Sequence, residues 1–203
     1  MTTKEHFYYY STALLALLGV TAIQPFDLLT WFLEIFPILI ALPVLWATYD
    51  NFRLTNLLYL LIFIHAVILM TGGHYTYARV PLGFWMQDWF DLSRNPYDRI
   101  GHLAQGFIPA LIAREILLRN KVLKPGAWLF IIVVAICMSI SVVYEFIEWW
   151  TAVILGQGAE EFLGTQGDQW DTQWDMFLAT VGAILGQLIF SKLQDKQISK
   201  VKF

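Results

Sequence analysis

Residues 127–155 read AWLFIIVVAICMSISVVYEFIEWWTAVIL, and this stretch decides the fold. A helix of about 20 mostly apolar residues is long enough to cross the hydrocarbon core of a membrane. The stretch is longer than that, and its two charged residues, Glu145 and Glu148, lie in its second half. It is therefore predicted to be a transmembrane helix with two acidic side chains towards one end.

Five further apolar stretches are separated by short polar or proline-containing breaks. They predict an all-α, polytopic membrane protein that forms one integral membrane domain over residues 1–203. Its first ten residues lead into an apolar stretch without a small-residue cleavage pattern, so we expect a retained helix and not a signal peptide. The six expected transmembrane helices cover about residues 8–23, 28–49, 54–75, 97–118, 127–155 and 170–190.

Several features within and between these stretches predict local geometry. Pro37 and Pro43 are expected to kink the second helix, because proline lacks a backbone donor. Gly182 and Gly186 are four residues apart, a spacing that lets the last helix pack closely on a neighbour. Residues 76–96 mix aromatic and charged side chains, which indicates an interfacial segment between the third and fourth helices.

Composition places the chain outside the soluble classes. It is 58% hydrophobic and 14% charged, whereas soluble domains carry roughly 25% charged residues. The net charge of −3 gives no indication of nucleic-acid binding, so we expect membrane lipids and no nucleic acid as partners. The lone cysteine, Cys137, excludes an intramolecular disulfide.

The distribution of lysine and arginine predicts the orientation. With six spans both termini lie on the same side, and that side would hold ten of the 13 basic residues. The opposite side would hold Arg79, Arg94 and Arg99. Because basic residues are enriched in cytoplasmic loops, both termini are expected in the cytoplasm.

Ionisable side chains from four predicted helices reach a similar height near the outer edge of the membrane. An α-helix rises about 1.5 Å per residue, so the distance of each group from its helix end can be compared. Such groups at membrane depth are costly and are usually buried, paired and functional. They are His74 at the end of the third helix, Asp98 and His102 at the start of the fourth, Glu145 and Glu148 towards the end of the fifth, and Asp171 and Asp175 at the start of the sixth.

The spacing of these residues gathers them on helix faces. Asp98 and His102 are four apart, Gln105 continues the same face, and Glu145 and Glu148 are three apart. Imidazole and carboxylate groups on facing helices can bind a metal, and close carboxylates suit general acid–base catalysis.

We therefore expect one outward-facing site. The candidate catalytic residues are Asp98, His102, Glu145, Glu148, Asp171 and Asp175. The candidate ligands of a divalent metal ion are His102, Glu145, Glu148 and Asp175. The candidate substrate-binding residues are Arg79, Arg99 and Gln105, with the two arginines able to hold a phosphate head group.

A structural explanation stays open for each group. Asp98 and Asp171 could each complement the dipole at the start of a helix. Arg99 could pair with Glu145 or Glu148 as a structural bridge.

Other ionisable residues are expected to need no special role. His74 is expected to be a hydrogen-bonded interfacial histidine and His65 a satisfied core residue. Glu34 and Glu115 are expected near helix ends, and Glu161 in solvent.

Three blocks of sequence carry a resemblance. They are NPYDRIGHLAQGF at 95–107, YEFIEW at 144–149 and GDQWDTQWDM at 167–176. In this order they resemble the YjdF family of bacterial inner-membrane proteins, a domain of unknown function. They are also similar to VanZ-like proteins, which share an Asp-x-x-x-His at a helix start, an acid on the next helix and a late Asp followed by glycines. The late VanZ block usually has an arginine before its aspartate and an asparagine after it, a form that this chain lacks.

The resemblance implies a multi-pass protein of the bacterial inner membrane with a shared site, and it implies no particular reaction. The residues themselves favour a membrane-embedded enzyme that acts on a lipid or cell-envelope precursor. An ion-coupled transporter and a non-catalytic membrane scaffold are the alternatives, and both use the same acidic residues.

Overall fold

The computed structural model describes residues 3–156 and 160–200, and the regular structure of this part is helical, without a β-strand. The long helices are α1 (Thr3–Thr21), α2 (Leu28–Thr48), α3 (Asn56–Tyr75), α5 (Tyr97–Arg119), α6 (Ala127–Leu155) and α8 (Asp171–Ile198). The short ones are η1 (Tyr77–Arg79), α4 (Pro81–Phe90) and α7 (Glu160–Leu163). Three parts of the expected domain lie outside the described residues: 1–2, 157–159 and 201–203. The last of these includes Lys202, one of the basic residues used for the orientation. The predicted all-α class is confirmed.

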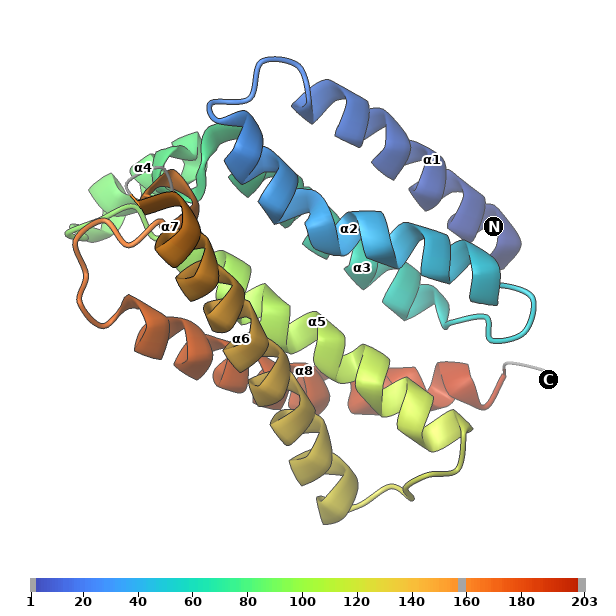
Figure 1. Cartoon of the computed structure of the whole chain (residues 1–203). Helices are drawn as coiled ribbons and strands as arrows, with labels where there is room; N and C mark the ends of the chain where they lie inside the picture. The colour runs from blue at the N-terminus through green and yellow to red at the C-terminus, as the bar shows by residue number, and fades with distance from the viewer. Residues whose placement is uncertain (1–2, 157–159, 201–203) are drawn as a thin grey trace.

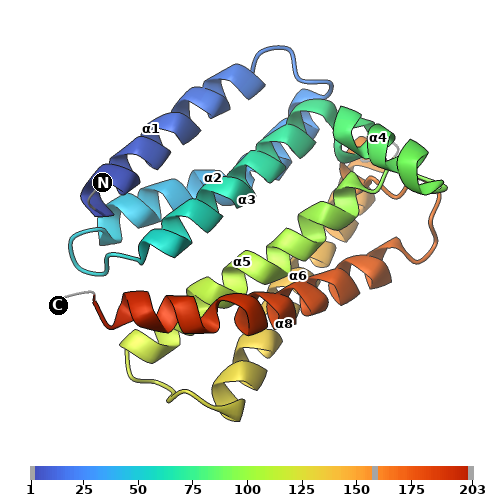
Figure 2. The same cartoon turned by 180° about the vertical axis from the view of Figure 1, so that it is seen from behind.

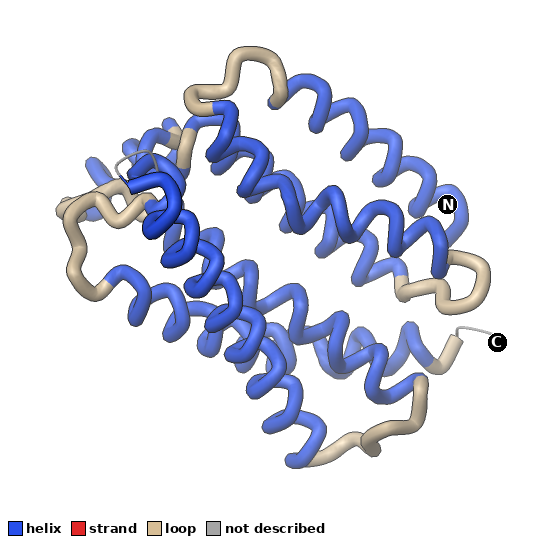
Figure 3. Tube along the Cα trace, viewed as in Figure 1, coloured by secondary structure: helices blue, strands red, loops and turns tan. Residues whose placement is uncertain are grey.

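The long helices lie side by side in two groups (Figures 1 and 2). One group contains α1, α2 and α3, and the other contains α5, α6 and α8. Helix α5 packs most extensively on α8 and also contacts α6 and α3, so it joins the groups. Both chain ends lie at one end of the helices, and α4 and α7 lie at the other (Figure 1). The connections run alternately at the two ends, as the tan segments in Figure 3 show.

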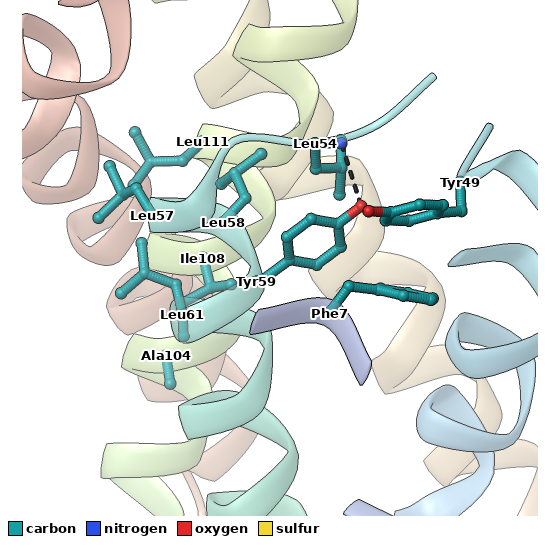
Figure 4. Close-up of a cluster of buried hydrophobic side chains, with 10 residues drawn as sticks. All are labelled: Phe7, Tyr49, Leu54, Leu57, Leu58, Tyr59, Leu61, Ala104, Ile108 and Leu111. Carbon is teal, nitrogen blue, oxygen red and sulfur yellow. Dashed lines mark hydrogen bonds between the residues drawn. The ribbon is translucent and has the colours of Figure 1, made fainter. Parts of the chain in front are cut away.

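An apolar cluster near the chain ends holds the two groups together. Leu58 of α3 and Leu111 of α5 are fully buried in it. Figure 4 shows leucines of α3 facing α5, with Phe7 of α1 beside Tyr59. The Tyr59 hydroxyl accepts a hydrogen bond from the Leu54 amide at 3.2 Å, so the only polar atom of that side chain is satisfied.

Glycines let α5 and α8 approach until their backbones touch. A Cβ atom added to Gly106 would lie 1.8 Å from the carbonyl oxygen of Ala179, and one on Gly182 would lie 2.1 Å from that of Leu103. Only glycine fits at such a contact, as in the close crossings of membrane helices. This packing brings the first turns of the two helices together.

Several helix ends differ from the expected bounds. The first helix begins at Thr3 and not near residue 8. The last helix continues to Ile198, although it was expected to end near residue 190. It continues because Gln194 is fully buried and donates to the carbonyl oxygen of Leu111 at 2.7 Å, which holds the polar segment against α5. Helix α3 begins at Asn56, two residues later than expected.

Glu115 of α5 has a structural role that the sequence analysis did not assign to it. Its side chain is fully buried and accepts hydrogen bonds from the Thr55 amide at 3.1 Å and the Thr55 hydroxyl at 2.8 Å. Arg119 lies 2.9 Å away on the same helix. The carboxylate therefore caps α3 from a neighbouring helix and is paired inside the bundle.

Four helices are long and apolar enough to cross a membrane: α2, α3, α6 and α8. The other two long helices, α1 and α5, are not among these four. Helix α5 carries five charged residues as well as His102 and Gln105.

Candidate functional site

The starts of α5 and α8 and the last turns of α6 meet at the end of the bundle that α4 and α7 cover. Asp98, His102 and Asp175 are buried there, at 7%, 6% and 2% exposure. Glu145 and Asp171 are also buried. The structure thus brings all six candidate catalytic residues to one end of the molecule.

Asn95 sets the start of α5. Its side-chain amide donates to the Val80 carbonyl at 3.0 Å, and its side-chain oxygen accepts the Tyr97 amide at 3.0 Å. A Cβ on Gly83 would lie 1.7 Å from that oxygen, so the glycine of α4 makes room for it. The first turn of α5 is therefore positioned by the segment that precedes it.

Arg94 is the central cation of the site. Its guanidinium contacts Asp171, lies 3.3 Å from Asp98 and 3.6 Å from Asp168, and donates to the Thr165 carbonyl at 2.8 Å. It joins the segment before α5 to the loop before α8 and neutralises the acids nearest to it. From the sequence alone, Arg94 is expected only as a charge in the loop before α5. Its position four residues before Asp98 was the available indication of this role.

His102 lies beside Asp98 and Asp175. Its Nδ1 is 2.9 Å from Oε1 of Gln105, and its Nε2 is 3.4 Å from Oδ1 of Asp98 and 3.7 Å from Oδ1 of Asp175. An amide oxygen can only accept, so Nδ1 of His102 is the donor in that contact. The Nε2 atom then faces the carboxylates.

Two groups of possible metal ligands share His102. One contains Asp98, His102 and Asp175, and the other contains His102, Glu145 and Glu148. Within each group the donor atoms lie within 4.8 Å of one another. We call these five residues the His102 cluster.

The His102 cluster contains unsatisfied oxygen atoms. Oδ1 of Asp175 and Oε1 of Glu145 are buried and have no hydrogen-bond partner among the described residues. A buried carboxylate without a partner is costly, and it requires a proton or a cation to offset its charge. Asp171, by contrast, contacts Arg94. The cluster therefore offers donor atoms that could hold a cation.

A cavity of about 160 Å³ lies beside the cluster. Asp98, His102 and Glu148 line it on one side and Glu34 of α2 on another. The Tyr144 hydroxyl donates to Oε2 of Glu34 at 3.1 Å, which bridges α6 and α2. Glu34 was expected near a helix end without a role. As the one charged residue of an apolar helix, it could have been found from the sequence.

The two candidate phosphate-binding arginines are already paired. Arg99 lies 3.4 Å from Asp168 and 5.3 Å from the ring centre of Trp174, not against Glu145 or Glu148 as one alternative had it. Arg79 lies 2.8 Å from Glu161 and stacks on Phe26.

The ion pair between Arg79 of η1 and Glu161 of α7 shifts the pKa values of both side chains. Hydrogen bonds from Arg79 hold the pKa of Glu161 below its ordinary value of 4.5. The same contact raises the pKa of Arg79. Glu161 is thus an ion-pair partner and not a free solvent charge.

Two further histidines lie outside the cluster. His74 uses Nδ1 to contact the Thr21 carbonyl at 3.0 Å, so it ties the end of α3 to the end of α1. His65 of α3 has a buried Nε2 without a partner in the described part of the chain. The expectation that His65 is satisfied in the core is therefore wrong for that atom.

Comparisons with known proteins support the membrane assignment. Residues 7–196 match a family described as a predicted membrane protein, DUF2238. The chain is 50% identical over 180 residues to the inner membrane protein YjdF of Escherichia coli (strain K12), and the match covers 89% of this chain and 86% of that protein. No solved structure matches the chain. The resemblance to the YjdF family predicted from the three sequence blocks is confirmed.

Proposed function

The chain belongs to the DUF2238 family of predicted membrane proteins, and from that premise we propose that its His102 cluster binds a divalent metal ion for a reaction on a lipid or cell-envelope precursor. The observation that carries the proposal is the pair of buried, unsatisfied carboxylate oxygens on Asp175 and Glu145 around the imidazole of His102.

We propose the six-span topology for this protein, with both termini in the cytoplasm of the host bacterium and the His102 cluster near the outer face. Four helices are apolar enough to span on their own. Helix α5 packs against α3, α6 and α8, so neighbouring helices cover its polar residues. Both chain termini lie at the same end of the bundle, which agrees with an even number of spans (Figure 1). The exposed aromatic residues Trp85 and Trp89 of α4 suit the interface at the other end.

The proposed metal ligands are His102, Glu145, Glu148 and Asp175. A mixed imidazole and carboxylate set is typical of zinc, manganese and iron sites. A bound divalent ion there would supply Lewis acidity and lower the pKa of a coordinated water. Gln105 would fix the tautomer of His102 through Nδ1, as outer-sphere partners of metal-binding histidines do.

Asp98 and Asp171 would serve the reaction from beside the ligands. Asp98 lies between Arg94 and His102, so it can hold or accept a proton next to the imidazole. Asp171 is held by Arg94 and would mainly position it. Arg99 is partly exposed at the edge of the site and would bind a phosphate head group. Arg79 on η1 would be a second cation for the same group.

Metal analysis of the purified protein tests the proposal. The wild type, Asp175→Asn and His102→Ala are each loaded with Zn²⁺, Mn²⁺ or Mg²⁺, desalted and analysed by mass spectrometry for bound metal. The matched control is Glu161→Gln, a carboxylate at the same end of the bundle that pairs with Arg79 instead. We expect about one ion per chain in the wild type and the control, and a large loss in both site variants. A wild type that retains no ion, or site variants that retain as much as the control, would contradict the proposal.

A further inference from the structure

We infer that a second, apolar cavity next to the His102 cluster binds the hydrocarbon chain of a lipid whose polar end lies at that cluster. The inference rests on the proposed function and adds the class of substrate, namely a lipid with a long hydrocarbon chain. It is carried by the position of two adjoining cavities.

The apolar cavity has a volume of about 280 Å³. It lies between α1, α2, α3 and α5, and its walls include Leu14, Ile38, Ala66 and Ile112. Ligand pockets usually measure about 300–1,000 Å³, so this space with the adjoining polar cavity is large enough for part of a lipid.

The two cavities meet inside the bundle. Pro37, His65, Leu69 and Pro109 line both of them. A flexible chain can therefore run from the carboxylates of the first cavity into the aliphatic walls of the second. The unpartnered Nε2 of His65 lies at this junction, where the lining changes from polar to apolar.

Both cavities reach the outer surface of the helices. Val44 on the wall of the apolar cavity is 53% exposed, and Ile140 on the wall of the polar cavity is 42% exposed. Val44 belongs to α2 and Ile140 to α6. In a membrane this surface faces lipid, so a hydrocarbon chain can enter sideways from the bilayer.

The lining selects hydrocarbon over water. Among the residues on the wall of the apolar cavity, His65 alone carries a polar side chain. An ordered water needs two to four polar partners, which this wall does not offer. A hydrocarbon chain fills such a space without requiring any polar partner.

Photolabelling in detergent tests the inference. The probe is phosphatidylglycerol with a mid-chain diazirine on one palmitoyl chain, added in trace amount to the full-length protein in dodecyl maltoside. After irradiation, mass spectrometry of peptides locates the label. We expect labelled residues in segments 37–45 and 62–69, which form two walls of the apolar cavity.

Two variants and a matched control make the result specific. Ala41→Phe fills the apolar cavity from α2, and Ile112→Phe fills it from α5. Ala47→Phe adds the same side chain to the exposed side of α2, away from both cavities. A phenyl ring occupies space that the chain would fill, so labelling of the two segments should fall about tenfold, which corresponds to about 1.4 kcal/mol in binding. The control should label as the wild type does.

The outcomes separate this inference from the proposed function. Labelling of the two segments that both cavity variants reduce supports the lipid site, even if no metal binds. Labelling confined to outer surfaces, or equal in folded cavity variants and control, overturns it. Folding is checked by gel filtration and circular dichroism, and the two variants act from opposite walls, so one folded variant is sufficient. The metal assay then stands or fails by its own result.

Discussion

Replacing Gly106 by alanine should separate α5 from α8 and destabilise the protein. The added Cβ would lie 1.8 Å from the Ala179 carbonyl oxygen, whereas ordinary contact begins at 3.4 Å. The backbones must move apart by about 1.6 Å, the difference between those distances. Overpacking of a well-packed contact costs about 1–3 kcal/mol, and the higher helix propensity of alanine returns about 0.5–1 kcal/mol. A net loss of about 1–2 kcal/mol corresponds to a fall in Tm of roughly 2–8 °C for a chain of this size.

Thermal unfolding in detergent, followed by tryptophan fluorescence, measures this change. The control is Gly19→Ala on α1, where an added Cβ meets nothing within 4 Å. That variant should unfold at the wild-type temperature or slightly above it, because alanine favours the helix. The displacement of α8 should also widen the 3.7 Å contact between His102 and Asp175 and weaken any metal bound there. A Gly106→Ala protein as stable as the wild type, or a Gly19→Ala protein as unstable as Gly106→Ala, would refute the packing argument.

Two further predictions concern ion pairs. Glu115→Gln should lower the free energy of unfolding by about 3–5 kcal/mol, because it breaks a fully buried ion pair and replaces one of the two oxygens that accept from Thr55 by an amide donor. Chemical denaturation in mixed micelles measures this loss. Glu161 has a lowered pKa, so its pair with Arg79 stabilises the fold above pH 4.5 and loses that contribution as the pH falls through the lowered value. Arg79→Gln should return the titration of Glu161 to about pH 4.5, as followed by NMR of labelled glutamate.

Each of these two predictions has a control or an outcome that would contradict it. Asp195→Asn removes a partner of Arg114 that is half exposed, and should cost only about 0–1 kcal/mol. An equal effect of Glu115→Gln and Asp195→Asn would contradict the role given to burial. For the surface pair, an unchanged titration of Glu161 in Arg79→Gln would show that the guanidinium is not the cause of its low pKa.

Part of the candidate site was predictable because it depends on local spacing. Asp98, His102 and Gln105 recur on one face of a helix, so their contact follows from the helical period alone. The contact is seen between His102 and Gln105 at 2.9 Å. The gathering of Asp175 beside them depends on how closely α8 crosses α5, and glycine spacing only indicated that a close crossing was possible.

Other parts depend on contacts between residues far apart in the chain. Arg94 meets Asp171 and Thr165 across more than 70 residues, and Tyr144 meets Glu34 across 110. No local pattern specifies such pairs, so the sequence analysis treated Arg94 as a loop charge and Glu34 as a helix-end residue. The continuation of α8 beyond residue 190 has the same cause, since the burial of Gln194 against α5 overrides the polar composition of the segment.

The sequence by itself determined the class of the molecule, because long apolar stretches can satisfy their backbone in a membrane only as helices. It also determined which ionisable residues lie near helix ends, since the rise per residue is constant. The tertiary structure decided which of these charges are neutralised by arginine and which remain unsatisfied around His102. It also decided that a second, apolar cavity adjoins them. Both depend on the relative positions of helices, which are set by the packing of many side chains at once and not by the spacing within any one segment.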